Sequence, residues 1–167
     1  MSEIAQIGAK LIKLLEEKSL TLATCESLTG GGIGATLTAI PGASKVYRGG
    51  FITYASDLKV LLAGVDAAHV AAHGVINALT AEQMAIGVAN NCRADIGLAV
   101  TGVAGPDSQD GAPVGEVWIG LARRDDPTSA RAKKVNLDGD RTAIRRQTIQ
   151  IALEWVLQFL ANHAYLN

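Results

Sequence analysis

Apolar residues recur at helical spacing at the start of the chain and then give way to a short apolar, β-branched run. The spacing predicts an amphipathic helix over residues 2–18, and it rests on Ile4, Ile7, Leu11, Leu14 and Leu15. The run that begins at Leu20 predicts a strand that ends at the segment Cys25-Glu26-Ser27-Leu28-Thr29-Gly30-Gly31-Gly32. The glycines then lead into a second helix near Ile33, which we expect to end before Pro41-Gly42.

The middle of the chain alternates between strand-like and helix-like segments. The residues 46–54 read as a strand after a loop at 43–45, and a short helix follows from about Asp57. Residues 66–73 predict another short helix, and Thr80 is the expected N-cap of a helix that runs to about Arg93.

The last third contains a buried strand, a hairpin and a long helix. Ile96 to Val100 is an almost continuous apolar run, which is typical of a strand covered on both faces. Segments 115–123 and 130–137 predict an antiparallel hairpin at a sheet edge, and residues 140–163 lack Pro and Gly and predict a closing helix. This order indicates an α/β fold: a single-domain layered sandwich, over residues 1–167, with a mixed sheet and flanking helices.

Composition narrows the classes of partner. The chain has 167 residues, of which 49% are hydrophobic, and a net charge of -1, which argues against nucleic acid or an anionic membrane as a partner. The N-terminus has no signal-peptide pattern, so we expect a cytoplasmic protein. The two cysteines form no CxxC pair, and we expect neither a zinc site nor a disulfide.

Ser27 is the first candidate nucleophile because it follows a strand and precedes glycines that allow a tight turn. Cys25 is the rival, although a small Cys in a strand more often packs in a core. A serine needs a base. His69 and His73 are one helical turn apart, but no carboxylate accompanies them as in a metal motif. Lys59 is the other base, if burial lowers its pKa, and its alternative role is a lysine that reaches from a surface helix into solvent.

Two further patterns leave alternatives open. Ser56-Asp57-Leu58-Lys59 fits S-x-x-K, but Ser56 also fits a helix N-cap. Residues 30–35 fit the G-x-G-x-x-G/A dinucleotide fingerprint, but the acidic residue expected at the end of the next strand is missing. Binding of a dinucleotide is therefore the weaker reading of these glycines.

Five separated motifs resemble the CinA C-terminal domain family, and they cover nearly the whole chain. They are Cys25 to Gly31, Gly50 to Tyr54 with Lys59, Thr101 to Pro106, Pro113 to Gly115, and Gly139 to Arg141 with Arg145. Members of that family include amidases that hydrolyse nicotinamide mononucleotide (NMN) to nicotinate mononucleotide and ammonia. Cys25 and Leu28 stand where many relatives carry Ala and Cys, and the domain is often fused behind a larger domain that this sequence lacks.

The resemblance implies that Ser27 is the nucleophile and Lys59 its base, with Tyr54 between them in the hydroxyl and amine network. Ser56 is then only a helix cap. The substrate-binding residues that it implies are Thr29, Gly30, Gly31, Ser44, Thr101, Gly102, Arg141 and Arg145. Arg141 is the most natural phosphate ligand, because a guanidinium is a permanent, forked donor.

The expected substrate is a small pyridine nucleotide, with no cofactor and no metal. We expect backbone N–H groups from Leu28 to Gly31 to stabilise the oxyanion, and Arg141 together with the substrate cation to help keep Lys59 neutral. A dimer is expected only because homo-oligomers are common. The alternative function is a non-catalytic nucleotide-binding or regulatory module.

Overall fold

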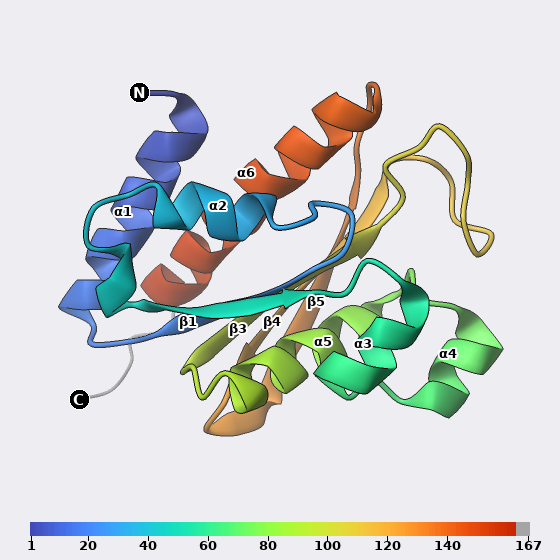
Figure 1. The fold of residues 1–167 in the computed structure, drawn as a ribbon, viewed down its shortest axis with the longest axis horizontal. Helices are drawn as coiled ribbons and strands as arrows, with labels where there is room; N and C mark the ends of the chain where they lie inside the picture. Colours follow the sequence, from blue (N-terminus) through green and yellow to red (C-terminus); the bar gives the residue numbers. More distant parts are fainter. Residues whose placement is uncertain (163–167) are drawn as a thin grey trace.

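The computed structural model describes residues 1–162, which form one five-stranded mixed sheet between two layers of helices (Figure 1). The strand order is β2-β1-β3-β4-β5. The first three strands in this order are parallel, and β4 and β5 continue the sheet as an antiparallel pair. The strands are β1 (Leu22–Glu26), β2 (Tyr47–Ile52), β3 (Ile96–Gly102), β4 (Glu116–Arg123) and β5 (Asp126–Asn136).

Helices cover both faces of the sheet (Figure 1). One layer contains α1 (Glu3–Glu17), α2 (Gly32–Thr38) and α6 (Arg141–Asn162). The other contains α3 (Ser56–Ala63), α4 (Ala67–His73) and α5 (Ala78–Asn91). A short 3-10 turn, Ala43–Lys45, leads into β2. The predicted α/β class with a mixed sheet is therefore confirmed.

The two faces of the sheet are packed with side chains of different size. In β3, Ile96, Leu98 and Val100 pack in the larger core beneath α1 and α6, whereas Ala99 belongs to a smaller core against α5. Gly97 explains how closely α5 approaches, because a Cβ added there would lie 2.0 Å from the carbonyl oxygen of Ala85. The apolar run of β3 thus divides its large and small side chains between two different layers.

The carboxyl ends of the three parallel strands lie side by side. Glu26 at the end of β1 pairs with Ile52 of β2 on one side and with Val100 of β3 on the other. Loops that follow such strand ends are the usual place for a ligand in a sheet of this kind. Ser27 directly follows β1, the strand in the middle of this parallel group.

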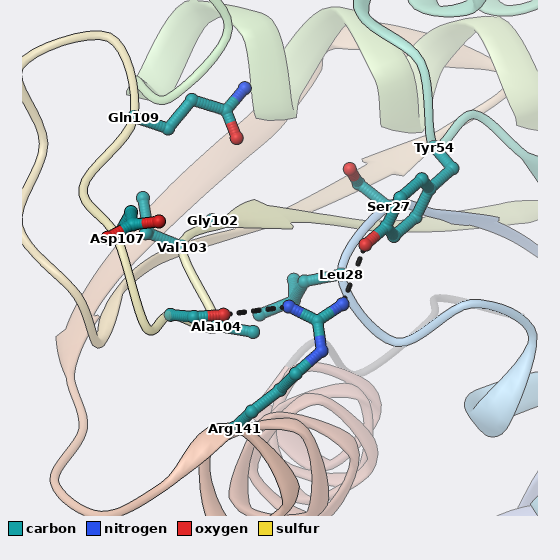
Figure 2. Close-up of a pocket in the computed structure, with 10 residues that line it drawn as sticks. Ser27, Leu28, Tyr54, Gly102, Val103, Ala104, Asp107, Gln109 and Arg141 are labelled. Carbon is teal, nitrogen blue, oxygen red and sulfur yellow. Dashed lines mark hydrogen bonds between the residues drawn. The ribbon is translucent and has the colours of Figure 1, made fainter.

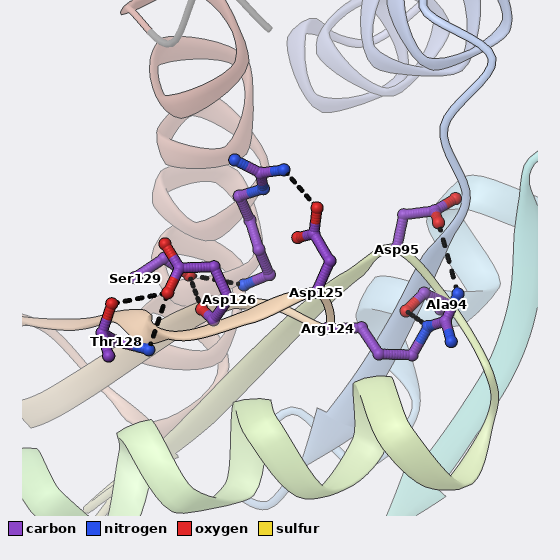
Figure 3. A network of polar contacts seen from close by, with 8 residues as sticks. Ala94, Asp95, Arg124, Asp125, Asp126, Thr128 and Ser129 are labelled. Atoms are coloured by element: carbon purple, nitrogen blue, oxygen red, sulfur yellow. Dashed lines mark hydrogen bonds and ion pairs between the residues drawn. The ribbon is translucent and has the colours of Figure 1, made fainter.

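The opposite end of the sheet is tied together by short polar contacts (Figure 3). The Arg124 Nε donates to the carbonyl oxygen of Ala94 over 3.1 Å, and its guanidinium lies 3.7 Å from the Asp95 carboxylate. At the start of β5, the Asp126 carboxylate accepts from the backbone N–H of Thr128 over 3.1 Å. These contacts join the β4–β5 turn to the segment that precedes β3 and hold the first residues of β5.

Two predicted boundaries differ from the structure. The N-cap of α5 is Asn77 rather than Thr80, because the Asn77 Oδ1 accepts from the backbone N–H of Thr80 over 2.9 Å. The second strand of the hairpin begins at Asp126 instead of residue 130, because the turn takes only two residues. The predicted end of the last helix, His163, lies outside the described residues. Among the described helices, none is both long enough and apolar enough to cross a bilayer.

Candidate active site

Ser27 and Lys59 meet at the carboxyl end of β1. The Lys59 Nζ lies 3.1 Å from the Ser27 Oγ. Both residues are nearly excluded from solvent, with 1% of Lys59 and 7% of Ser27 exposed. Lys59 is on α3, so the predicted pair comes from two elements that are separated by β2 in the sequence.

The amine of Lys59 is held by the backbone beside Ser27. Its Nζ donates to the carbonyl oxygen of Thr53 over 2.8 Å, and the N–H of Thr53 donates to the carbonyl oxygen of Glu26 over 2.8 Å. The N–H of Ser27 in turn donates to the Val100 carbonyl oxygen over 3.1 Å. Nucleophile and amine are therefore fixed to the same three-strand framework.

Burial lowers the pKa of Lys59 from 10.5 to about 8, against smaller raising effects of Cys25 and Asp110. An ammonium loses hydration when it is buried, which favours the neutral amine. The expected contribution of Arg141 is not among the causes of this shift. A substantial fraction of Lys59 is thus neutral near pH 8 without any help from a neighbouring cation.

Cys25 lies in the core rather than in the site. It is fully buried in the smaller core against α5, and its Sγ lies 3.5 Å from the Thr53 hydroxyl. Burial raises the pKa of this thiol to about 11. A protonated, enclosed thiol is a poor nucleophile, so the geometry favours Ser27.

An open cleft of about 130 Å³ adjoins Ser27 (Figure 2). One wall is the loop after β3, another is Tyr54, and the N-terminus of α6 supplies Arg141. The lining residues are Ser27, Leu28, Tyr54, Gly102, Val103, Ala104, Gly105, Asp107, Gln109 and Arg141. A small ligand in this cleft would contact the serine hydroxyl and the arginine at once.

Tyr54 differs from its predicted place. It is 58% exposed, and its hydroxyl accepts a hydrogen bond from the Arg141 guanidinium over 2.6 Å (Figure 2). Among the described residues, no hydrogen bond joins this hydroxyl to Ser27 or Lys59. The amine has a carbonyl partner of its own, and Tyr54 instead belongs to the wall of the cleft.

The two arginines of α6 have different surroundings. Arg141 lines the cleft and donates to the Gly105 carbonyl oxygen over 2.9 Å as well as to Tyr54. Arg145 lies outside the lining and donates to the carbonyl oxygens of Leu28 and Thr29, over 2.9 and 3.1 Å. Arg145 therefore clamps the loop after Ser27, while Arg141 faces the space where a ligand would lie.

The glycine loop uses most of its own donors internally. The N–H of Gly30 donates to the Ser27 carbonyl oxygen over 3.0 Å, and that of Gly31 donates to the Glu26 carboxylate over 3.1 Å. The Thr29 hydroxyl also donates to this carboxylate. Within the described residues, the backbone N–H groups of Leu28 and Thr29 have no protein acceptor. Of the four predicted oxyanion donors, these two alone are unoccupied.

This arrangement also bears on the dinucleotide fingerprint. Its use would require backbone N–H groups at the start of α2 that are open to a pyrophosphate. The N–H groups of Gly31, Ile33 and Gly34 all donate to Glu26 instead. The fingerprint is thus a turn whose donors are already satisfied within the protein.

The remaining predicted binding residues divide between the cleft and other places. Gly102 lies in the cleft wall, but the hydroxyl of the fully buried Thr101 donates to the Val75 carbonyl oxygen over 2.8 Å. Ser44 is exposed on the 3-10 turn and lines a separate hollow with Thr38 and Ile40. The structure does not bring Ser44 into the cleft.

Ser56 is not the cap that was expected. The N-cap of α3 is Ala55, and no side chain caps this helix. Ser56 is an exposed first residue of the helix, whereas the Lys59 side chain one turn later points inward to Ser27. Ser56, which is near Lys59 in the sequence, is therefore exposed, whereas Ser27, which is near it in space, is buried.

His69 and His73 contact each other on α4, and His69 also contacts the N-cap residue of α5. The His69 ring hydrogen-bonds through its Nε2 to the Asn77 Oδ1 over 2.8 Å, and the centroids of the His69 and His73 rings are 5.1 Å apart. Within residues 1–162, no group of three or more His, Cys, Asp or Glu is arranged to hold a metal ion.

Three residues near the site were not predicted from the sequence. Asp107 and Gln109 line the cleft from the loop after β3. Glu26 does not line the cleft, but its carboxylate accepts hydrogen bonds from the loop after Ser27. The signal for Glu26 was available, because a charged residue at the end of a buried strand needs several donors, and a glycine turn supplies them. The loop after β3 offered no such signal.

The sequence matches one family model and several curated bacterial proteins. A family model described as "CinA C-terminal domain" matches residues 4–160. A "CinA-like protein" of Frankia casuarinae is 44% identical over 90% of this chain and 34% of its own length. A second "CinA-like protein", from Citrifermentans bemidjiense, is 40% identical over 93% of this chain and 37% of its own length. The chain spans about a third of the length of these curated relatives.

Solved structures match over almost their full length. The competence/damage inducible protein CihA of Agrobacterium tumefaciens has a TM-score of 0.90 and 34% identity, and the match covers 97% of this chain and 98% of that one. The competence damage-inducible protein A of Klebsiella pneumoniae has a TM-score of 0.91 and 28% identity, with coverage of 97% and 99%. The fold and the sequence thus point to the same group of proteins.

Proposed function

Because the chain belongs to the CinA C-terminal domain family, we propose that it is a serine amidohydrolase that converts NMN and water to nicotinate mononucleotide and ammonia. The observation that carries the proposal is the buried Ser27–Lys59 pair, with 3.1 Å between the Oγ and Nζ atoms, at the edge of an open cleft. A serine with a neutral amine within hydrogen-bond reach is a recurring arrangement for nucleophilic catalysis.

In the first step, neutral Lys59 accepts the proton of the Ser27 hydroxyl while the Oγ forms a bond to the carboxamide carbon. The carbonyl π pair moves to the oxygen, and the positive pyridinium ring makes that carbon more electrophilic. The pair on the oxygen then re-forms the carbonyl as the C–N bond breaks, and the Lys59 ammonium gives its proton to the departing NH₂ group, which leaves as ammonia. Water next attacks the acyl ester with Lys59 as base, which releases the carboxylate and restores Ser27.

The developing oxyanion needs donors on the Ser27 side of the cleft. The free N–H groups of Leu28 and Thr29 follow the nucleophile directly. Arg145 binds the Leu28 carbonyl oxygen, which belongs to the same peptide as the Thr29 N–H, and also the carbonyl oxygen of Thr29. One such donor is typically worth about 3 kcal/mol in the transition state. The glycine turn then serves to shape this loop.

The phosphate of NMN would be bound by Arg141. Its guanidinium lies in the cleft and uses only part of its donor set on Tyr54 and Gly105. Arg145 is engaged with Leu28 and Thr29 outside the cleft and is the weaker candidate. A guanidinium can bind a phosphate through two parallel N–H···O bonds.

The test is ammonia release from NMN by the wild type, Ser27→Ala and Ser56→Ala. We expect Ser27→Ala to lower kcat by about 10³-fold or more, because removal of a nucleophile removes covalent catalysis. Ser56→Ala is the matched control, since this serine is exposed and close in sequence to Lys59. Normal turnover by Ser27→Ala would reject the nucleophile. NMN binding by the wild type without ammonia release would instead indicate a non-catalytic nucleotide-binding module.

A further inference from the structure

Glu26 carries a buried carboxylate that no catalytic step above uses. Only 1% of the residue is exposed. Its Oε2 accepts from the Thr29 hydroxyl over 2.6 Å, from the Gly31 N–H over 3.1 Å and from the Ile33 N–H over 3.0 Å. Its Oε1 accepts from the Gly34 N–H over 2.8 Å. The Thr24 hydroxyl adds a longer contact to Oε1, over 3.5 Å. Five donors thus converge on one enclosed carboxylate, four of them within 3.1 Å.

The four shorter contacts come from the segment that follows the nucleophile, whereas Thr24 lies before it on β1. A carboxylate is costly to bury, and multiple hydrogen bonds to its charged form offset that cost. An amide in the same place would turn an N–H₂ group toward donors that need an acceptor. The contacts therefore require the charge of Glu26, and they fix the path of the chain from Thr29 to Gly34.

The backbone of Glu26 reaches the other member of the pair. Its carbonyl oxygen accepts from the Thr53 N–H, and the Thr53 carbonyl oxygen accepts from the Lys59 Nζ, each over 2.8 Å. Glu26 thus supports the loop that contains the free N–H groups of Leu28 and Thr29. It also binds Thr53, whose carbonyl oxygen accepts from the Lys59 amine.

The Glu26 side chain does not face the ligand. It is absent from the cleft lining, and with Gly31 and Gly34 it borders a hollow on the side of β2. Successive residues of a strand point to opposite faces, which places Glu26 behind Ser27. Its influence on chemistry must therefore pass through the loop.

We propose that Glu26 is a positioning residue, whose carboxylate acts as an internal anion that holds the Ser27 loop and its oxyanion donors in the reactive geometry. The proposal rests on the proposed function for its effect on NMN turnover. Its effect on the reactivity of Ser27 does not depend on which amide is the substrate.

The test compares Glu26→Gln with Glu116→Gln in the full chain. Glu116 is a matched control, because its side chain is 12% exposed and its carboxylate contacts Lys134 and Trp118 on the β4–β5 hairpin, outside the cleft lining. The measurements are kcat and KM for NMN, thermal unfolding, and the rate at which phenylmethylsulfonyl fluoride modifies Ser27, followed by intact mass.

We expect folded Glu26→Gln to lose about 100-fold in kcat and in the sulfonylation rate, because small displacements of a reacting group have effects of this size. Its KM should stay within threefold, and its kcat/KM should keep the acidic limb set by Lys59. Glu116→Gln should match the wild type. A folded Glu26→Gln with kcat and sulfonylation rate within threefold of the wild type would overturn the proposal.

If Glu26→Gln does not fold, Thr29→Val tests the same contact from the other side. It removes the hydroxyl donor and keeps the side-chain shape, and we expect about tenfold slower sulfonylation with an unchanged KM. An unchanged rate overturns the proposal. If the wild type is sulfonylated at Ser27 but does not turn over NMN, only the proposed substrate is rejected. The role of Glu26 is then tested by the sulfonylation rates alone. A wild-type Ser27 that shows neither reaction overturns both proposals.

Discussion

Arg141 and Tyr54, which are 87 residues apart in the sequence, are joined by a hydrogen bond of 2.6 Å at the cleft. The guanidinium also donates to the Gly105 carbonyl oxygen, so three separate segments meet at this side chain. An arginine held in this way loses less conformational freedom when a ligand binds. We therefore expect Tyr54 to orient Arg141.

Arg141→Met should raise the KM for NMN by about 10- to 100-fold and leave kcat within threefold. A charge-assisted hydrogen bond is worth about 1.5–3 kcal/mol, and the proposed bond from Arg141 to the phosphate would stabilise the bound substrate and the transition state equally. Arg146→Met, which changes an exposed arginine of the same helix, should behave as the wild type. The steady-state KM for NMN and for the phosphate-free riboside is the measurement. An unchanged KM for NMN would exclude Arg141 as the phosphate ligand.

The pH profile of kcat/KM should have an acidic limb with a slope of one and a midpoint near pH 8. In the proposed mechanism only neutral Lys59 can accept the Ser27 proton, and burial lowers the pKa of Lys59 to about 8. Activity therefore rises as the pH increases toward 8 and then reaches a plateau. Rates measured from pH 6 to 9.5 test this, and a rate that stays constant down to pH 6 would contradict the role of Lys59.

The burial of Lys59 should also be visible in the free energy of unfolding. The pKa of Lys59 is about 8 in the folded state and near 10.5 when unfolded, so between these values the unfolded chain binds more protons. Stability contributed by this residue therefore increases as the pH rises through that window.

Relative to Lys59→Met, the wild type should gain about 2 kcal/mol between pH 7.5 and 10. Urea unfolding of both proteins at several pH values measures the difference, in which most other titrating groups cancel. Parallel curves for the two proteins would contradict a lowered pKa.

Two glycine substitutions should change stability in opposite directions. Gly97→Ala places a Cβ 2.0 Å from the Ala85 carbonyl oxygen, and we expect a loss of about 3 kcal/mol. Gly8→Ala adds a methyl group inside α1 at 3.6 Å from its nearest contact and should gain about 0.5–1 kcal/mol. Denaturant midpoints measure both changes. A Gly97→Ala protein as stable as the wild type would show that α5 can move away from the sheet.

The order and type of the main elements could be predicted from the sequence, because their signals are local. The spacing of Ile7, Leu11 and Leu15 in α1 and the apolar run of β3 each determine an element within one short window. The N-cap residues of the helices were harder to predict from the sequence. The choice of Asn77 over Thr80, and of Ala55 over Ser56, depends on where the preceding loop places the first free N–H group.

The site was predictable only as a set of residues and not as a network. Lys59 on a short helix reads equally well as a surface lysine, since its burial results from strands that lie beside it only after folding. The same holds for Arg145, whose carbonyl partners are 116 and 117 residues away. The roles of Ser27 as nucleophile and Lys59 as base remain predictions that the proposed variants test.

The convergence of backbone donors on Glu26 has a consequence for the energetics of substrate capture. A loop that orders only around its ligand subtracts the entropy of that ordering from the binding free energy. Here the carboxylate that organises the loop is part of the chain and arrives during folding. The entropy cost of ordering this loop therefore lowers the free energy of unfolding. It does not lower the binding free energy of the substrate, which depends on the contacts in the cleft.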